Sequence, residues 1–236
     1  MTALLPAWTR RAVVTVLTCC AIFVAAVGQV VNGLPRTQRL DTVADLAVMR
    51  AVSQHQDVMH LVAGLGEKAA VSVLTAVLVL VCLALRRLNG ALLVAIAMPV
   101  APALTEFALK PASPDGYASF PSGHTTATFA GATVVCVLLA APGTRISRLW
   151  RLALALGGLV AGVAVAVAVI GLGMHSLTDA VGGAAVGIGV ALSVALLLDL
   201  PPTRRLLTLI GGALGELPRR IAGHTSGPPS PNDPAA

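Results

Sequence analysis

Six long apolar runs constrain this sequence more than any other feature. A helix that crosses a bilayer needs about 20 mostly apolar residues. Runs close to that length lie at 12–31, 69–85, 91–109, 124–140, 152–172 and 176–198. Only 11% of the residues are charged, whereas soluble domains contain roughly 25%. We therefore expect an all-α, polytopic membrane protein built as a bundle of six transmembrane helices.

The remaining segments define the expected domain organisation. Residues 1–11 form a short N-terminal segment, and 12–200 form the membrane domain with a polar loop at 32–68. Residues 201–236 are expected to hold an interfacial helix and a disordered tail rich in Pro, Gly and Ser. The first apolar run could instead be a cleaved signal peptide, but it is long for one and further spans follow. Asp41 is expected to cap a helix on the membrane surface.

Basic residues are distributed unequally between the two sides of such a bundle. One side carries Arg10, Arg11, Arg86, Arg87, Arg145, Arg148, Arg151, Arg204, Arg205, Arg219 and Arg220. The other side carries only Arg36, Arg39, Arg50, Lys68 and Lys110. The positive-inside rule makes the first side cytoplasmic, so we expect a multi-pass protein of the cell membrane with both termini inside. This distribution accounts for the net charge of +6 without a nucleic-acid partner.

The segment 120–126, Phe-Pro-Ser-Gly-His-Thr-Thr, lies between a short polar loop and the fourth apolar run. Ser122 is a good helix N-cap, and Gly123 lets backbone amides come close to a ligand. The free amides and positive dipole end of a helix start favour a bound anion. His124 beside such an anion indicates proton transfer. The alternative interpretation is an ordinary helix cap.

His175 and Asp179 form a His-x3-Asp pattern at the start of the sixth run. Residues four apart on a helix share one face, so the carboxylate can accept the imidazole N–H and fix its tautomer. The other ring nitrogen is then free to act as a nucleophile. An ionisable residue in a membrane helix indicates a functional site. The alternative is a structural His–Asp pair that joins two helices.

Together these groups fit phosphoryl transfer on the outer face. His175 would attack phosphorus to give a phosphohistidine, and His124 would protonate the leaving oxygen and later activate water. The phosphate oxygens would be bound by Lys110, Ser122 and Gly123. A structural ion pair with Glu106, one turn earlier, is the alternative role of Lys110. No metal or other cofactor is expected, because a lysine and an anion-binding turn oppose zinc and the four cysteines have no metal-type spacing.

The segments Phe120-Pro-Ser-Gly-His124 and His175-Ser-Leu-Thr-Asp179-Ala-Val-Gly-Gly resemble the motifs of the type 2 phosphatidic acid phosphatase family. That family comprises six-helix membrane lipid phosphatases and soluble relatives that include vanadium haloperoxidases. The resemblance covers roughly residues 61–198. It implies catalytic roles for His124, His175 and Asp179, and phosphate-binding roles for Ser122 and Gly123.

Two cationic positions of the family pattern differ in this chain. The first motif is Lys-x6-Arg-Pro, and Lys110 matches its lysine, but no arginine follows before His124. If Lys110 is matched to the arginine instead, the lysine position falls on Ala103. The third motif places an arginine six residues before the nucleophile, where this chain has Val169. Each charge-assisted contact is worth about 1.5–3 kcal/mol, so weak activity, an altered substrate or lost catalysis would follow. The residues that could substitute are Arg36, Arg39 and Arg50.

The function expected from these observations is hydrolysis of a lipid phosphate or diphosphate at the outer leaflet. Apolar walls would hold the acyl or prenyl tail, so the partners are a lipid phosphate substrate and membrane lipids. The alternative is a catalytically degenerate relative that binds lipid phosphates or partners without turnover. The missing arginines favour this alternative, and the intact histidine motifs oppose it. A transporter or proton relay has little support, because the two halves contain no matching pair of broken helices.

Overall fold

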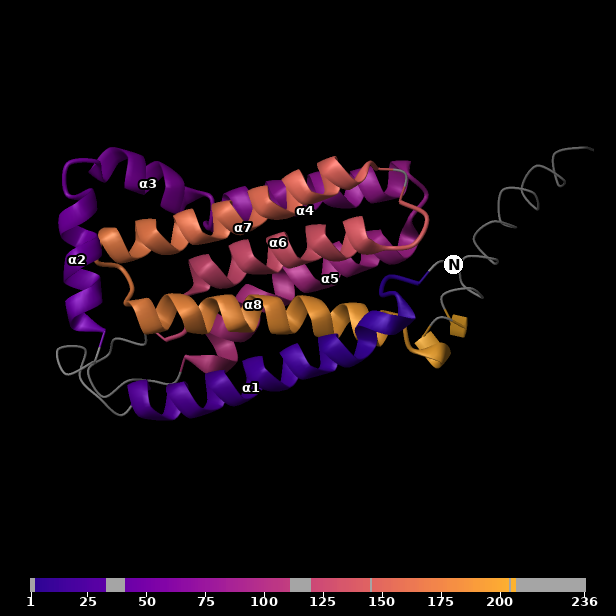
Figure 1. Cartoon of the computed structure of the whole chain (residues 1–236), viewed down its shortest axis with the longest axis horizontal. Helices are drawn as coiled ribbons and strands as arrows, with labels where there is room; N and C mark the ends of the chain where they lie inside the picture. The colour runs from indigo at the N-terminus through magenta and orange to yellow at the C-terminus, as the bar shows by residue number, and fades with distance from the viewer. Residues whose placement is uncertain (1–2, 33–40, 111–119, 145, 204, 207–236) are drawn as a thin grey trace, which may run out of the picture. The chain divides into compact units, whose positions relative to one another are not determined.

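The computed structural model describes residues 3–32, 41–110, 120–144, 146–203 and 205–206 (Figure 1). The chain forms two compact units, one of residues 2–199 and one of Met1 with residues 200–236. In the second unit, residues 201–203 and 205–206 are helical. The rest of the predicted interfacial helix and the tail lie outside the described residues.

The described residues of the first unit are helical and contain no β-strand. In chain order the helices are η1 (Ala7–Thr9), α1 (Arg10–Asn32), α2 (Thr42–Val52), α3 (Gln56–Gly64), α4 (Lys68–Ala84), α5 (Leu88–Leu104), the π-helical turn η3 (Thr105–Leu109), α6 (Gly123–Ala140), α7 (Arg148–Gly171) and α8 (Leu177–Leu198). Five helices are long and apolar enough to cross a membrane, with α5 and η3 counted together. The α3–α4 pair, bent by 45°, adds a sixth if it is one span. The protein is therefore an all-α bundle of the multi-pass kind.

Helix α6 holds the centre of the bundle, where it packs against α8, α7 and α5 (Figure 1). Helix α1 packs along α8, and α4 packs against α5. The fully buried apolar side chains at this centre are mainly small or medium-sized: Val94, Ala97, Met98, Ala101, Ala130, Val134, Ala191 and Ala195. Large apolar side chains such as Leu80 and Val160 are exposed on α4 and α7. Lipid would solvate such faces, whereas small residues let the helix backbones approach closely.

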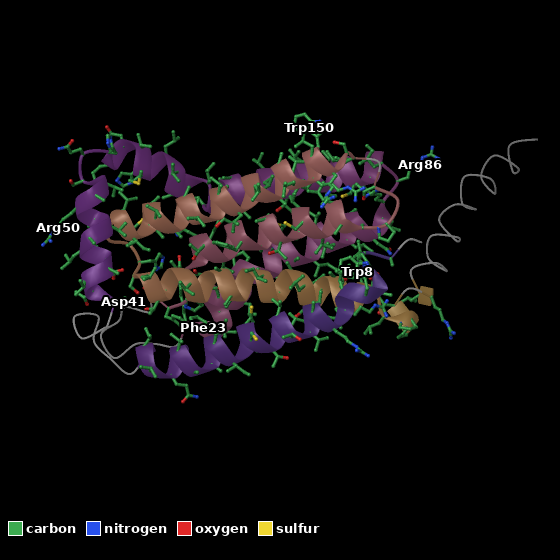
Figure 2. The ribbon with its side chains drawn as sticks, viewed as in Figure 1. Trp8, Phe23, Asp41, Arg50, Arg86 and Trp150 are labelled. Carbon is green, nitrogen blue, oxygen red and sulfur yellow. The ribbon has the colours of Figure 1, made fainter. Side chains whose placement is uncertain are left out.

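Helices α6 and α8 run parallel, because α7, which connects them, runs in the opposite direction to both. Both begin at one end of the bundle, which we call the histidine end, and α2 crosses this end (Figure 1). At the opposite, arginine end, Arg87 Nη1 donates to Thr144 Oγ1 at 2.9 Å and Arg151 Nη2 donates to the Thr144 carbonyl at 2.6 Å. Arg86 and the exposed Trp8 also lie at the arginine end (Figure 2).

Candidate active site

The start of α6 is built as its sequence predicts. Ser122 is the N-cap, and its Oγ accepts the Thr125 amide at 3.5 Å. Its carbonyl accepts the hydroxyls of Thr125 and Thr126 at 3.2 and 2.8 Å. The predicted cap is therefore confirmed. Among the described residues, the amides of Gly123 and His124 find no acceptor, so two donors of the first turn remain for a ligand.

Close packing holds the starts of α6 and α8 together. The Ser122 amide donates to the Asp179 carbonyl at 2.9 Å. Gly183 makes this approach possible, since a Cβ there would lie 2.3 Å from Thr125 Oγ1 and 2.4 Å from the Ser122 carbonyl oxygen. The consequence is that the rings of His124 and His175 lie side by side, with centroids 6.1 Å apart and planes at 62°.

His175 lies just before α8 and not on it, which corrects the expectation of a shared helix face. The helix begins at Leu177 with Ser176 as N-cap, so helical spacing does not apply to His175 and Asp179. Their closest atoms, Nδ1 and Oδ2, are 3.7 Å apart, which is too long for a hydrogen bond. Asp179 Oδ2 accepts the Ser176 amide at 3.0 Å in a capping box. His175 Nδ1 is buried and has no hydrogen-bond partner in the described part of the chain.

Two carboxylates, Asp41 at the N-cap of α2 and Asp45 in its first turn, accept hydrogen bonds from the start of α8. Asp45 Oδ1 accepts the Leu177 amide at 2.8 Å, and Asp41 Oδ2 accepts both the amide (2.9 Å) and the hydroxyl of Thr178. Asp41 occupies the N-cap position of α2, as expected, but its side chain makes no cap hydrogen bond there. Figure 2 shows it at the end of α2 nearest α8. Burial raises the pKa of Asp41, but the hydrogen bonds from Thr178 outweigh burial and hold this pKa below its ordinary value.

Lys110 and Glu106 form an ion pair beside the start of α6. Lys110 Nζ lies 2.7 Å from Glu106 Oε1, and the same oxygen would lie 2.7 Å from a Cβ on Gly123. The structural ion pair that was the alternative role of Lys110 is therefore present. The contact of Glu106 with Gly123 places this pair beside the start of α6.

A cavity of about 380 Å³ opens beside this turn. Its polar lining residues are Glu67, Lys68, Glu106, Gly123 and His124, and its apolar ones include Val71, Pro102 and Ala127. Gly66 lets the α3–α4 turn pack closely against α6, because a Cβ on Gly66 would lie only 2.9 Å from His124 Cβ. Glu67 and Lys68 were not singled out from the sequence, where Lys68 was only one of the outer-face cations.

The structure describes one of the two positions where the family motifs have an arginine and this chain has none. Val169 is fully buried in an apolar cluster between α3 and α7, so no cation stands at the third-motif position. Arg50 is exposed and points away from the bundle (Figure 2), which removes it as a substitute. Arg36 and Arg39 lie outside the described residues. Over the described ranges, Lys68 is the cation that lines the cavity, and no group of three His, Cys, Asp or Glu side chains could hold a metal ion.

Comparisons with known proteins bear on the two histidine motifs of this site. A family model described as the PAP2 superfamily matches residues 97–200. That range contains Lys110, the turn at 121–124, His175 and Asp179. Searches of curated proteins and of solved structures gave no match to this chain. The family model thus agrees with the resemblance seen in the two histidine motifs and is consistent with a protein of the PAP2 superfamily.

Proposed function

We propose that this protein is a membrane phosphatase that hydrolyses a lipid phosphate or diphosphate. The match of residues 97–200 to the PAP2 superfamily model suggests a phosphatase-like function. The observation that carries the proposal is the 6.1 Å separation of the His124 and His175 rings, next to two amides without acceptors. Nucleophilic attack needs about 3–3.5 Å between reacting atoms, and proton transfer needs about 2.6–3.2 Å. One phosphoryl group can therefore contact both imidazoles.

The reaction would proceed in two steps through a phosphohistidine. A ring nitrogen of His175 attacks phosphorus, the bond from phosphorus to the leaving oxygen breaks, and His124 donates a proton to that oxygen. His124 then takes a proton from water, whose oxygen attacks phosphorus and releases phosphate, which restores His175. The Asp179 carboxylate, 3.7 Å from His175 Nδ1, would stabilise the imidazolium. The proposed phosphate-binding residues are Lys110, Ser122 and Gly123.

The composition of the cavity wall supports a lipid substrate. Polar groups surround His124, whereas Val71, Pro102 and Ala127 line the rest of the wall. A phosphate headgroup at His124 would leave its tail against these apolar side chains. Lys68, on the polar wall, would supply positive charge in place of the arginines that the chain lacks.

The charges at the two ends of the bundle support an orientation. Arginines gather at the end opposite the histidines, and cytoplasmic loops are the ones enriched in arginine. The exposed Trp8 at the arginine end fits an aromatic side chain at a membrane interface. We therefore propose that residues 12–200 form the membrane domain of a cell-membrane protein whose termini are cytoplasmic and whose active site faces outward.

A second candidate function is binding of lipid phosphates without turnover. Two observations favour it: the arginine position of the third motif holds the buried Val169, and Lys110 is already paired with Glu106 at 2.7 Å. Both reduce the positive charge available to stabilise a phosphoryl group in its transition state.

Phosphate release by the purified protein distinguishes the two functions. The assay would use micelles that contain a diacylglycerol phosphate, a prenyl monophosphate or a prenyl diphosphate. We expect His175→Ala to abolish release, and His60→Ala, which alters an exposed histidine of α3, to preserve it. Unchanged release by His175→Ala would reject the assignment of the nucleophile. Binding of all three lipids without release by the wild-type protein would favour the second function.

A further inference from the structure

The carboxylate of Glu106 lies where an incoming phosphate would have to bind. Its Oε1 would be 2.7 Å from a Cβ on Gly123, so it lies against the first residue of α6. The same oxygen is 2.7 Å from Lys110 Nζ. Glu106 also lines the cavity that contains His124. One carboxylate thus contacts the lysine, the helix start and the space proposed for the headgroup.

The starts of α6 and α8 differ in whether their backbone amides have acceptors. Carboxylates or hydroxyls accept the amides of residues 176–179 at distances of 2.8–3.3 Å. At α6, by contrast, the amides of Gly123 and His124 have no acceptor among the described residues. Glu106 lies beside these amides without accepting them, so it contributes negative charge but leaves the donors open.

Like charges disfavour each other more strongly in a partly dehydrated pocket than in water. A phosphate that approaches the amides of Gly123 and His124 meets Glu106 at the same place. It must draw Lys110 away from that carboxylate before the lysine can bind a phosphate oxygen. The penalty increases with the negative charge of the phosphate group.

We propose that Glu106 determines the charge of the headgroup that this site retains. The inference rests on the proposed phosphatase function and deepens it. Glu106 weakens binding of the doubly charged phosphate group, both in a monoester substrate and in the product, inorganic phosphate. It thereby promotes product release and weakens the binding of phosphomonoester substrates. Glu106 is a specificity residue in this account and takes no part in the transfer of the phosphoryl group.

Binding of inorganic phosphate tests this inference without any need for turnover. We expect Glu106→Gln to tighten phosphate binding, measured by titration calorimetry, by about tenfold, which corresponds to about 1.4 kcal/mol. In the lipid assay the same variant should lower KM for a monoester. Glu106→Asp, which keeps the charge, should bind phosphate with nearly wild-type affinity.

Glu67→Gln is the matched control, because Glu67 lines the same cavity but forms no ion pair with Lys110 in the described structure. It should tighten phosphate binding less than Glu106→Gln does. Equal effects of the two variants would overturn the inference, since any carboxylate in the cavity would then suffice. Unchanged or weaker binding in Glu106→Gln, or no phosphate binding by any variant, would also overturn it. If the wild-type protein binds phosphate but shows no turnover, only the proposed phosphatase function is contradicted.

Discussion

Replacement of Gly183 by alanine should separate the two histidines. A Cβ at this position would lie 2.4 Å from the Ser122 carbonyl oxygen, whereas ordinary contact begins at 3.4 Å. The starts of α6 and α8 would have to move apart by about 1 Å, and overpacking of this kind costs about 1–3 kcal/mol. A displacement of about 1 Å at reacting groups can reduce turnover about 100-fold. We therefore expect Gly183→Ala to lose both stability and phosphate release.

Gly189 provides the control within the same helix. A Cβ there would meet only Cys20 Cβ, at 3.8 Å, so Gly189→Ala should gain up to about 1 kcal/mol of helix propensity and keep its activity. Thermal unfolding followed by circular dichroism in detergent measures stability, and phosphate release measures turnover. If the two variants had the same midpoint and the same turnover, the contact between Gly183 and the α6 start would not position the histidines.

Two further predictions concern charges at the histidine end. Lys68→Gln should raise KM for a lipid phosphate by roughly tenfold, which is the value of one charge-assisted contact. Arg50→Gln makes the same change of charge at a residue that points outward, so it should leave KM unchanged. Equal changes in KM would mean that Lys68 acts only through net charge. Asp41→Asn should cost about 1 kcal/mol of stability near neutral pH, because it weakens hydrogen bonds to the Thr178 amide and hydroxyl. Since the folded pKa of Asp41 is below its unfolded value, its contribution is fully present above about pH 4 and is lost as the pH falls through the folded pKa. The difference in unfolding midpoint between wild type and Asp41→Asn should therefore shrink below about pH 4, and a constant difference would contradict this account.

Local signals in the sequence predicted much of the fold. All six apolar runs lie within four residues of an observed helix, because bilayer thickness sets the length of a span. The Ser122 cap was predictable because an N-cap depends on residues within one turn. The α3 helix escaped notice, since it lies in the longest polar stretch and meets α4 at a bend of 45°.

The site was less predictable because its geometry depends on contacts between distant residues. Asp41 and Thr178 are separated by 137 positions, and nothing in the spacing of α2 indicates that its carboxylates reach α8. The His-x3-Asp pattern suggested a helix face, but the capping box starts the helix after His175. The contact of Glu106 with Gly123 depends on how η3 directs its side chain toward the start of α6, which periodicity along one helix does not reveal.

The hydrogen bonds that Asp41 and Asp45 accept from the start of α8 decide how many unoccupied helix N-termini lie beside the two imidazoles. While Asp41 and Asp45 accept the amides of Leu177 and Thr178, the start of α6 is, within the described part of the histidine end, the helix start that offers unoccupied amides to an incoming phosphate. Both aspartates precede the portion matched by the superfamily, residues 97–200. A protein trimmed to that portion would expose a second cradle next to His175, where a phosphate could bind out of line with its leaving group.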